Sequence, residues 1–491
     1  MSNANSPPTA AAGKNLWQYT ASAVGILIVF GFGCLPPIDP ITPMGMKVFG
    51  IFLGMIFLWS FVSILWPSLL GIVAIALSGY APMREVLKMS FGDQVSTLVL
   101  FAMVLFGAIQ HAGVTRYISR WFLTRKIING RPVMFSFVFI YAAYVLAVLS
   151  ASVLPVILFM WAILYDVLNE VGYKKGEKYT TIMVVGTLFG TISGQAAKPF
   201  TGSALMIIGS FEKAANASLE YLPYMLFGFI MSSLAVIGYA LLIKFVLRPD
   251  MTKISRISIE HFDREKLPPM DACQKVMTFT LVSFFVLVFL PSIVPKTLPG
   301  MSWLIKLGPL GVVIMFLAAL ACLRINNKPA LNFTEMARKY VIWDVYFLVC
   351  MAMAISAAMV NKSTGITEFL RTMLDPLLGG HSYLLFAAIL VIFGMSITQF
   401  ANNGVMGVLL MPVVKVFCDQ TGGNFEGTAT LLIFALHVAL LTPSASPYAA
   451  VLYGNKDWLS QGDTFKLSLV IILMALLLYV VVGIPVMRMI Y

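Results

Sequence analysis

Two short polar clusters interrupt long apolar stretches of the chain and lie about half its length apart. They are Ser150, Ala151 and Ser152 in the first half, and Asn402, Asn403 and Gly404 in the second. Their hydroxyl and carboxamide groups can donate hydrogen bonds to a carboxylate. A helix broken at such a cluster also leaves N–H groups open to anions and carbonyls open to cations. Paired breaks in two halves indicate the substrate site of a secondary transporter.

Each cluster is followed by another apolar segment with a break of its own. The first break contains Thr201 and Ser203, and the second contains Ser446 and Pro447. Both segments combine proline with small hydroxyl residues, and proline removes a backbone donor from a helix. A single break of this kind is an ordinary kink, but four in repeat-related order predict one central site. Hydrocarbon cannot satisfy the opened backbone, so such breaks line a cavity or pack against protein.

The composition is that of a membrane protein. Of 491 residues, 59% are hydrophobic and 11% are charged, and the mean hydropathy is +0.90. Since a span needs about 20 mostly apolar residues, the chain is used up by about 11 transmembrane helices. We therefore predict an all-α polytopic membrane protein built from two inverted repeats, each with about five spans and a re-entrant hairpin.

Enzyme and pump functions find no support in the sequence. It has no phosphate-binding loop, no metal-ligand spacing and no nucleophile with a plausible base nearby. The five cysteines have no paired spacing, so we expect no disulfide and no metal. We expect no cofactor, no nucleic acid partner and no ATP-driven pumping.

The net charge of the chain is +12, and its Lys and Arg residues are concentrated in a few short loops. Placing these loops in the cytoplasm, under the positive-inside rule, predicts a cytoplasmic N-terminus and an exterior C-terminus in an inner or plasma membrane. The segments that flank the second hairpin agree with this plan, because they are almost free of basic residues, as an exterior loop should be.

The predicted organisation has two repeats separated by a linker. Asp93 and Asp344 start matching apolar runs, which end at similar triplets around Gly113 and Gly365. An odd number of passes in each half would give the copies opposite orientations. The predicted segments are a disordered tail at 1–15, a first repeat at 16–247 with a hairpin near 134–168 and an interrupted span near 180–209, a cytoplasmic linker at 248–273, and a second repeat at 274–491 with a hairpin near 384–416 and an interrupted span near 428–454.

From about Trp66 to its end, the chain resembles the divalent anion/sodium symporter family, part of the wider ion transporter superfamily. Members carry a Ser-Asn-Thr triplet at each hairpin tip and a proline-containing signature, such as Thr-Pro-Pro-Asn, in each interrupted span. Here the triplets and signatures are altered. Ala151 replaces the central Asn of the first triplet, and Gly404 lacks the hydroxyl of the second.

The resemblance implies roles for these positions. Substrate would contact both clusters and the two signatures, and the position of Gln399 just before the second hairpin tip predicts that it also faces the substrate. A coupling sodium ion would be held by oxygens of Ser150, Gly194, Asn402 and Ala445. Because each triplet has lost a side-chain ligand, sodium coupling is in doubt. The resemblance also implies a homodimer, which the sequence itself does not indicate.

Lys198 lies deep in the first interrupted span. An ionisable residue there costs about 2.5–3.5 kcal/mol on insertion scales and is a functional candidate. A fixed ammonium could supply the countercharge that sodium brings elsewhere, and such a carrier would exchange one anion for another. Snorkelling to an interface or pairing with a carboxylate would equally explain the residue.

The sequence therefore predicts a secondary carrier of small organic anions, di- or tricarboxylates, that works by alternating access between the bilayer's two sides, as an exchanger without sodium coupling. A sodium- or proton-coupled symporter of carboxylate, sulfate or another oxyanion remains open. An anion channel is the alternative from a different class.

Overall fold

The protein is described by a computed structural model. It describes residues 9–114, 117–118, 130–150, 152–200, 202–256, 269–295, 298, 300–325, 327–370, 372, 382–400, 402–443 and 445–491. Ala151 and Thr201, which we predicted to contact the substrate, lie outside these residues.

The described part of the chain is helical apart from two short strands. The first half contains α1 Thr9–Gly31, η1 Phe32–Cys34, α2 Pro43–Phe61, α3 Leu65–Leu77, α4 Met83–Ser90, α5 Gln94–His111, α7 Pro132–Leu149, α8 Val153–Glu170, α9 Lys178–Ala197, α10 Gly202–Ala215, α11 Tyr221–Leu242, η3 Ile243–Leu247 and η4 Ile254–Arg256. The second contains α12 Ala272–Ile293, α13 Met301–Cys322, β1 Arg324–Ile325, β2 Lys328–Pro329, α14 Phe333–Tyr340, α15 Trp343–Met359, η6 Lys362–Thr364, α17 Tyr383–Ile397, α18 Asn403–Thr421, α19 Phe425–His437, α20 Pro447–Gly454, α21 Gln461–Leu478, η7 Tyr479–Gly483 and α22 Ile484–Ile490. The strands β1 and β2 form one antiparallel pair.

The predicted fold class is confirmed. Among the described residues, ten helices are long and apolar enough to cross a membrane, and α14 with α15, bent by 83°, gives an eleventh if counted as one span. One boundary differs from the prediction, because α1 already begins at Thr9, inside the stretch expected to be a disordered tail. Three alanines follow Thr9, and alanine has the highest intrinsic helix propensity.

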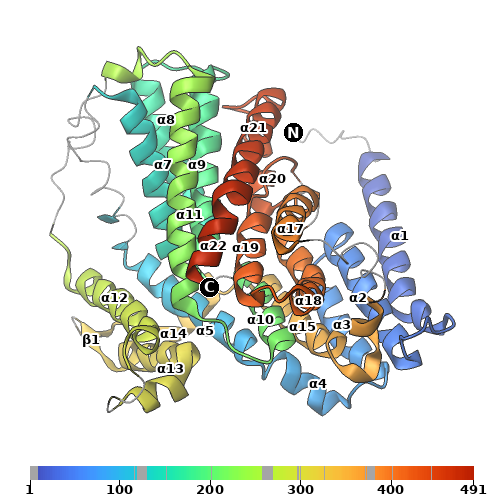
Figure 1. The fold of residues 1–491 in the computed structure, drawn as a ribbon. Coiled ribbons are helices and arrows are strands. Elements are labelled where there is room, and N and C mark those ends of the chain that lie inside the picture. The colour runs from blue at the N-terminus through green and yellow to red at the C-terminus, as the bar shows by residue number, and fades with distance from the viewer. Residues whose placement is uncertain are drawn as a thin grey trace, which may run out of the picture.

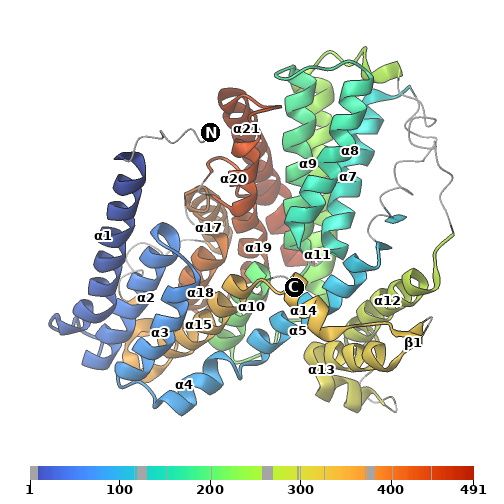
Figure 2. The ribbon, with the colours of Figure 1, turned by 180° about the vertical axis from the view of Figure 1, so that it is seen from behind.

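The same order of elements occurs in both halves. A short helix and a span, α4–α5 or α14–α15, precede a helical hairpin, α7–α8 or α17–α18. A broken span follows, α9–α10 or α19–α20, and then a long span that contains a π-helical turn, η3 after α11 and η7 after α21. In Figures 1 and 2 the first hairpin stands beside α9 and α11, while α12–α14 and α1–α4 lie at opposite edges.

Glycines on one face of α9 allow this helix to lie unusually close to α7. A Cβ atom at Gly190 would lie 2.6 Å from the Ile140 carbonyl oxygen, and one at Gly194 would lie 2.3 Å from that of Tyr144. The four-residue spacing places these glycines on one helix face, as in other close membrane helix pairs. Helix α9 thus presents its C-terminal break to the hairpin tip at a fixed position.

Two buried tyrosines of α11 hold α9 from its other side. The Tyr239 hydroxyl donates to the Ile182 carbonyl at 2.7 Å, and the Tyr224 hydroxyl donates to that of Ala196 at 2.6 Å. The second bond falls next to the end of α9, where regular helical partners run out. These contacts fix the break from which Lys198 extends.

Candidate functional site

A cavity of about 130 Å³ lies where four helices begin. The helix starts that line it are Ser152 and Val153 of α8, Gly202 and Ser203 of α10, Asn402, Asn403 and Gly404 of α18, and Ser446, Pro447 and Tyr448 of α20. The structure thus brings both hairpin tips and both broken spans to one place. Each helix start presents the positive end of a helix dipole.

The opposite wall of this central cavity is apolar. Ile64, Met103, Ile342, Val345 and Leu348 form it, and they come from α3, α5, α15 and their flanks. Among the described residues that line the cavity, none is charged at neutral pH. Anion recognition here therefore falls to backbone N–H groups and neutral donors, as at other helix N-termini.

The amide nitrogens of Asn402 and Asn403 point away from the start of α18. The Asn402 and Asn403 Oδ1 atoms accept from the Gly404 N–H at 3.0 and 2.9 Å. Because a backbone N–H can only donate, the atom facing it in each side chain is the oxygen. Both Nδ2 groups remain as donors at the cavity wall.

Helix α8 offers further donors. Its N-cap residue, Ser152, makes no side-chain capping bond, so the first N–H groups of the helix carry no cap from that hydroxyl. The first N–H groups of an α-helix have no intrahelical partners. Of these, Ser152 and Val153 line the cavity, whereas Pro155, the third residue of the helix, has no N–H group.

A hydrogen-bonded chain connects the two repeats beside the cavity. Gln195 Nε2 donates to the Ser203 hydroxyl at 3.2 Å, and that hydroxyl lies 3.0 Å from Nε2 of His437. His437 Nδ1 is 2.7 Å from the Ile433 carbonyl oxygen, which can only accept, so Nδ1 carries the proton and Nε2 accepts from Ser203. In the neutral tautomer that fits these contacts, His437 is a buried link in this hydrogen-bonded chain.

Gln399 does not line the central cavity, although the sequence placed it among the substrate ligands. Its Nε2 donates to the Val438 carbonyl at 2.6 Å, and its Oε1 accepts from the N–H groups of Leu440 and Leu441 at 3.2 and 3.0 Å. These backbone groups belong to the unwound segment between α19 and α20. The carboxamide thus replaces hydrogen bonds that a continuous helix would have made.

Lys198 lies behind the first hairpin tip. It is 1% exposed, its ammonium donates to the Ser150 carbonyl, and it lies 3.9 Å from the centre of the Phe106 ring. It neither lines the central cavity nor reaches an interface. The Lys198 side chain is therefore held at the backbone of the tip, where its contact residue Ser150 lies two residues before Ser152.

The residues predicted for a coupling ion are spread over separate contacts. The Ser150 carbonyl accepts from Lys198, and the Asn402 oxygen caps α18. Gly194 packs against α7, and Ala445 is fully buried in the second break. Within the described ranges, no group of three His, Cys, Asp or Glu side chains could hold a metal ion.

Sequence reasoning missed Tyr448 and the apolar wall. Tyr448 directly follows Pro447 in the second break, so its place in the signature could have indicated it. Nothing in the sequence distinguishes Met103 or Val345 from the many other buried apolar residues.

Comparisons with known proteins find one matching family and a similar fold. The sequence model of one family, described as the sodium:sulfate symporter transmembrane region, matches residues 13–490. The crystal structure of the Alcanivorax borkumensis YdaH transporter, reported to have an unusual topology, superposes with a TM-score of 0.55 at 14% identity, covering 91% of this chain and 98% of that one. A search of curated proteins found no match.

Proposed function

This chain belongs to the sodium:sulfate symporter family and is a multi-pass secondary transporter, and from that premise we propose that it carries small dicarboxylates or tricarboxylates by exchange. The anion binds in the central cavity, between the two hairpin tips. Movement of the hairpin-bearing part against the remaining spans gives alternating access. The inner or plasma membrane, with a cytoplasmic N-terminus, and a homodimer belong to the same proposal.

The convergence of four helix starts on one uncharged cavity is the observation that supports this function. Each start carries about half a positive elementary charge, so four of them offer roughly two charges, which matches a divalent anion. The Asn402 and Asn403 amides add directed donors. A volume of about 130 Å³ suits a small anion rather than a nucleotide or a lipid.

Lys198 supports exchange without sodium. Its ammonium contacts the Ser150 carbonyl, the kind of oxygen that a coupling cation would use. A tethered cation moves with the protein in both directions and is not released. The carrier then returns most readily with a second anion, because the loaded site balances the fixed charge.

The test is uptake of labelled succinate into proteoliposomes that contain the purified protein. Vesicles are loaded with succinate or left empty, and the outer buffer contains sodium or choline. We expect uptake that requires internal succinate and is equal in both buffers. Sodium-dependent uptake into empty vesicles would overturn the exchange proposal, and labelled sulfate in a parallel arm distinguishes an oxyanion carrier.

Lys198→Ala tests the role of the fixed charge. We expect this variant to lose succinate exchange while it still folds, as judged by its elution as a single species in detergent. Lys415→Ala is the matched control, because that lysine pairs with Asp419 on the same helix, away from the cavity. Unchanged exchange in Lys198→Ala would contradict the proposal.

A further inference from the structure

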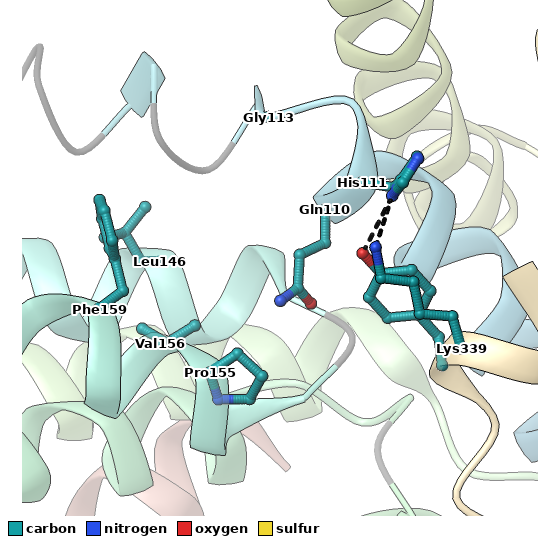
Figure 3. A pocket seen from close by; sticks show the side chains of 9 residues that line it. Gln110, His111, Gly113, Leu146, Pro155, Val156, Phe159 and Lys339 are labelled. Atoms are coloured by element: carbon teal, nitrogen blue, oxygen red, sulfur yellow. Dashed lines mark hydrogen bonds between the residues drawn. The ribbon is translucent and has the colours of Figure 1, made fainter.

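A second and larger cavity, of about 330 Å³, lies between the end of α5, the end of α14 and the first hairpin (Figure 3). Its polar wall consists of Gln110 and His111 of α5 and Lys339 and Tyr340 of α14. Pro155 and Val156 of α8 contribute to the apolar wall opposite. The volume lies in the ordinary range of small-molecule sites, about 300–1,000 Å³.

Donors on the polar wall are left over after the internal contacts are made. Lys339 Nζ lies 3.2 Å from Nδ1 of His111. An ammonium can only donate, so Nδ1 accepts and the proton of the neutral ring is on Nε2. The ammonium keeps two further N–H groups, and it contacts no carboxylate within the part of the chain that the structure describes.

Gln110 gives a second, independent indication of a ligand. Its Oε1 is buried and has no hydrogen-bond partner among the described residues. Leaving such an atom unpaired is unfavourable, because its hydrogen bonds to water are lost and not replaced. Figure 3 shows the Gln110 side chain reaching into the space between His111 and Pro155. Rotation of the terminal amide can present either its oxygen or its NH₂ group to a bound molecule.

The two cavities are bounded by the same two elements. On α8, Ser152 and Val153 line the central cavity, and Pro155 and Val156 line the second one. On the bent pair α14–α15, Ile342 and Val345 line the central cavity, while Lys339 and Tyr340 line the second. About one helical turn therefore separates the two cavities along α8, and the 83° bend between α14 and α15 separates them on the other element.

We infer that the second cavity is an antechamber that binds the transported anion before it enters the central cavity. The carboxylate head contacts Lys339 and Gln110, and its carbon chain lies against the α8 wall. The basic segments that follow α5 and surround α14 place this entrance on the cytoplasmic side under the predicted topology. The inference rests on the proposed function, because it assigns the same substrate a second position.

The test is the succinate concentration dependence of exchange in vesicles of phosphatidylcholine alone. We expect Lys339→Ala to raise KM at least fivefold with kcat within twofold, Lys339→Arg to restore KM, and Lys339→Glu to raise it further. Raising the ionic strength should raise the KM of the wild-type protein more than that of Lys339→Ala, because salt screens the charge of the Lys339 ammonium. Lys88→Ala is the matched control, at the end of the corresponding helix α4 and paired with Glu85 at 2.8 Å.

Each outcome decides between the explanations. Wild-type protein that exchanges no succinate contradicts the proposed function itself. Wild-type exchange with an unchanged KM in Lys339→Ala overturns the antechamber alone. An effect of Lys339→Ala that appears only when anionic lipid is added would assign the cavity to a lipid headgroup and would also overturn it.

Discussion

Gln399→Ala tests whether the second broken span depends on one side chain. The substitution removes the partner of three backbone groups, the buried Val438 carbonyl and Leu440 N–H group and the partly buried Leu441 N–H group. Single hydrogen bonds in membrane proteins contribute about 0.6 kcal/mol on average and up to roughly 1.7. For three groups the loss is about 2–5 kcal/mol in free energy of unfolding.

The assay is reversible unfolding of the purified protein in mixed micelles with increasing SDS. Thr398→Val is the graded comparison, because it removes a single bond, from the Thr398 hydroxyl to the Leu436 carbonyl at 2.8 Å. Ser396→Ala is the neutral control, since that exposed hydroxyl bonds only within its own helix. We expect the loss in free energy of unfolding to be largest for Gln399→Ala, smaller for Thr398→Val and smallest for Ser396→Ala.

A loss in free energy of unfolding below about 0.5 kcal/mol for Gln399→Ala lies within the range of ordinary surface substitutions. It would show that the Gln399 side chain does not stabilise the second broken span. If Gln399 instead contacts the anion, as its place in the sequence suggests, the variant would keep its stability and show a raised KM. The two readings therefore differ in both measurements.

Two further variants probe the site and the core. Asn402→Asp keeps an oxygen to cap α18 but replaces the amide donor with a negative charge. We therefore expect KM for succinate to rise at least tenfold, about 1.4 kcal/mol, with no loss of thermal stability. An unchanged KM would exclude this amide from the site. Gly190→Ala places a Cβ atom 2.6 Å from the Ile140 carbonyl oxygen, so we expect it to lower the free energy of unfolding by about 1–3 kcal/mol. Gly462→Ala meets no atom within 4 Å and is its control; equal stability of the two would argue against the close α7–α9 contact.

Much of the fold could be predicted from the sequence, because the bilayer limits what a broken apolar segment can do. The first hairpin was expected near 134–168 and is formed by Pro132–Leu149 and Val153–Glu170. The second was expected near 384–416 and is formed by Tyr383–Ile397 and Asn403–Thr421. Proline and small polar residues mark these breaks directly, and the resemblance to an anion transporter family is confirmed.

The roles of individual side chains could not be predicted in the same way. Gln399 precedes a hairpin tip in the sequence, but a segment about 40 residues later determines its contacts. The antechamber combines Gln110, Pro155 and Lys339, which no local pattern connects. Which way the Asn402 and Asn403 amides point depends on a single backbone N–H, that of Gly404, and only the folded helix start reveals it.

The most direct test of anion binding between the two hairpin tips is a cryo-electron microscopy structure of the protein in lipid nanodiscs with succinate. We predict density in the central cavity within hydrogen-bonding distance of the Asn402 and Asn403 amides and the Val153 N–H group, and weaker density there in Asn402→Asp at a succinate concentration near the wild-type KM. Succinate density elsewhere in the molecule, with none between the hairpin tips, would contradict substrate binding in the central cavity.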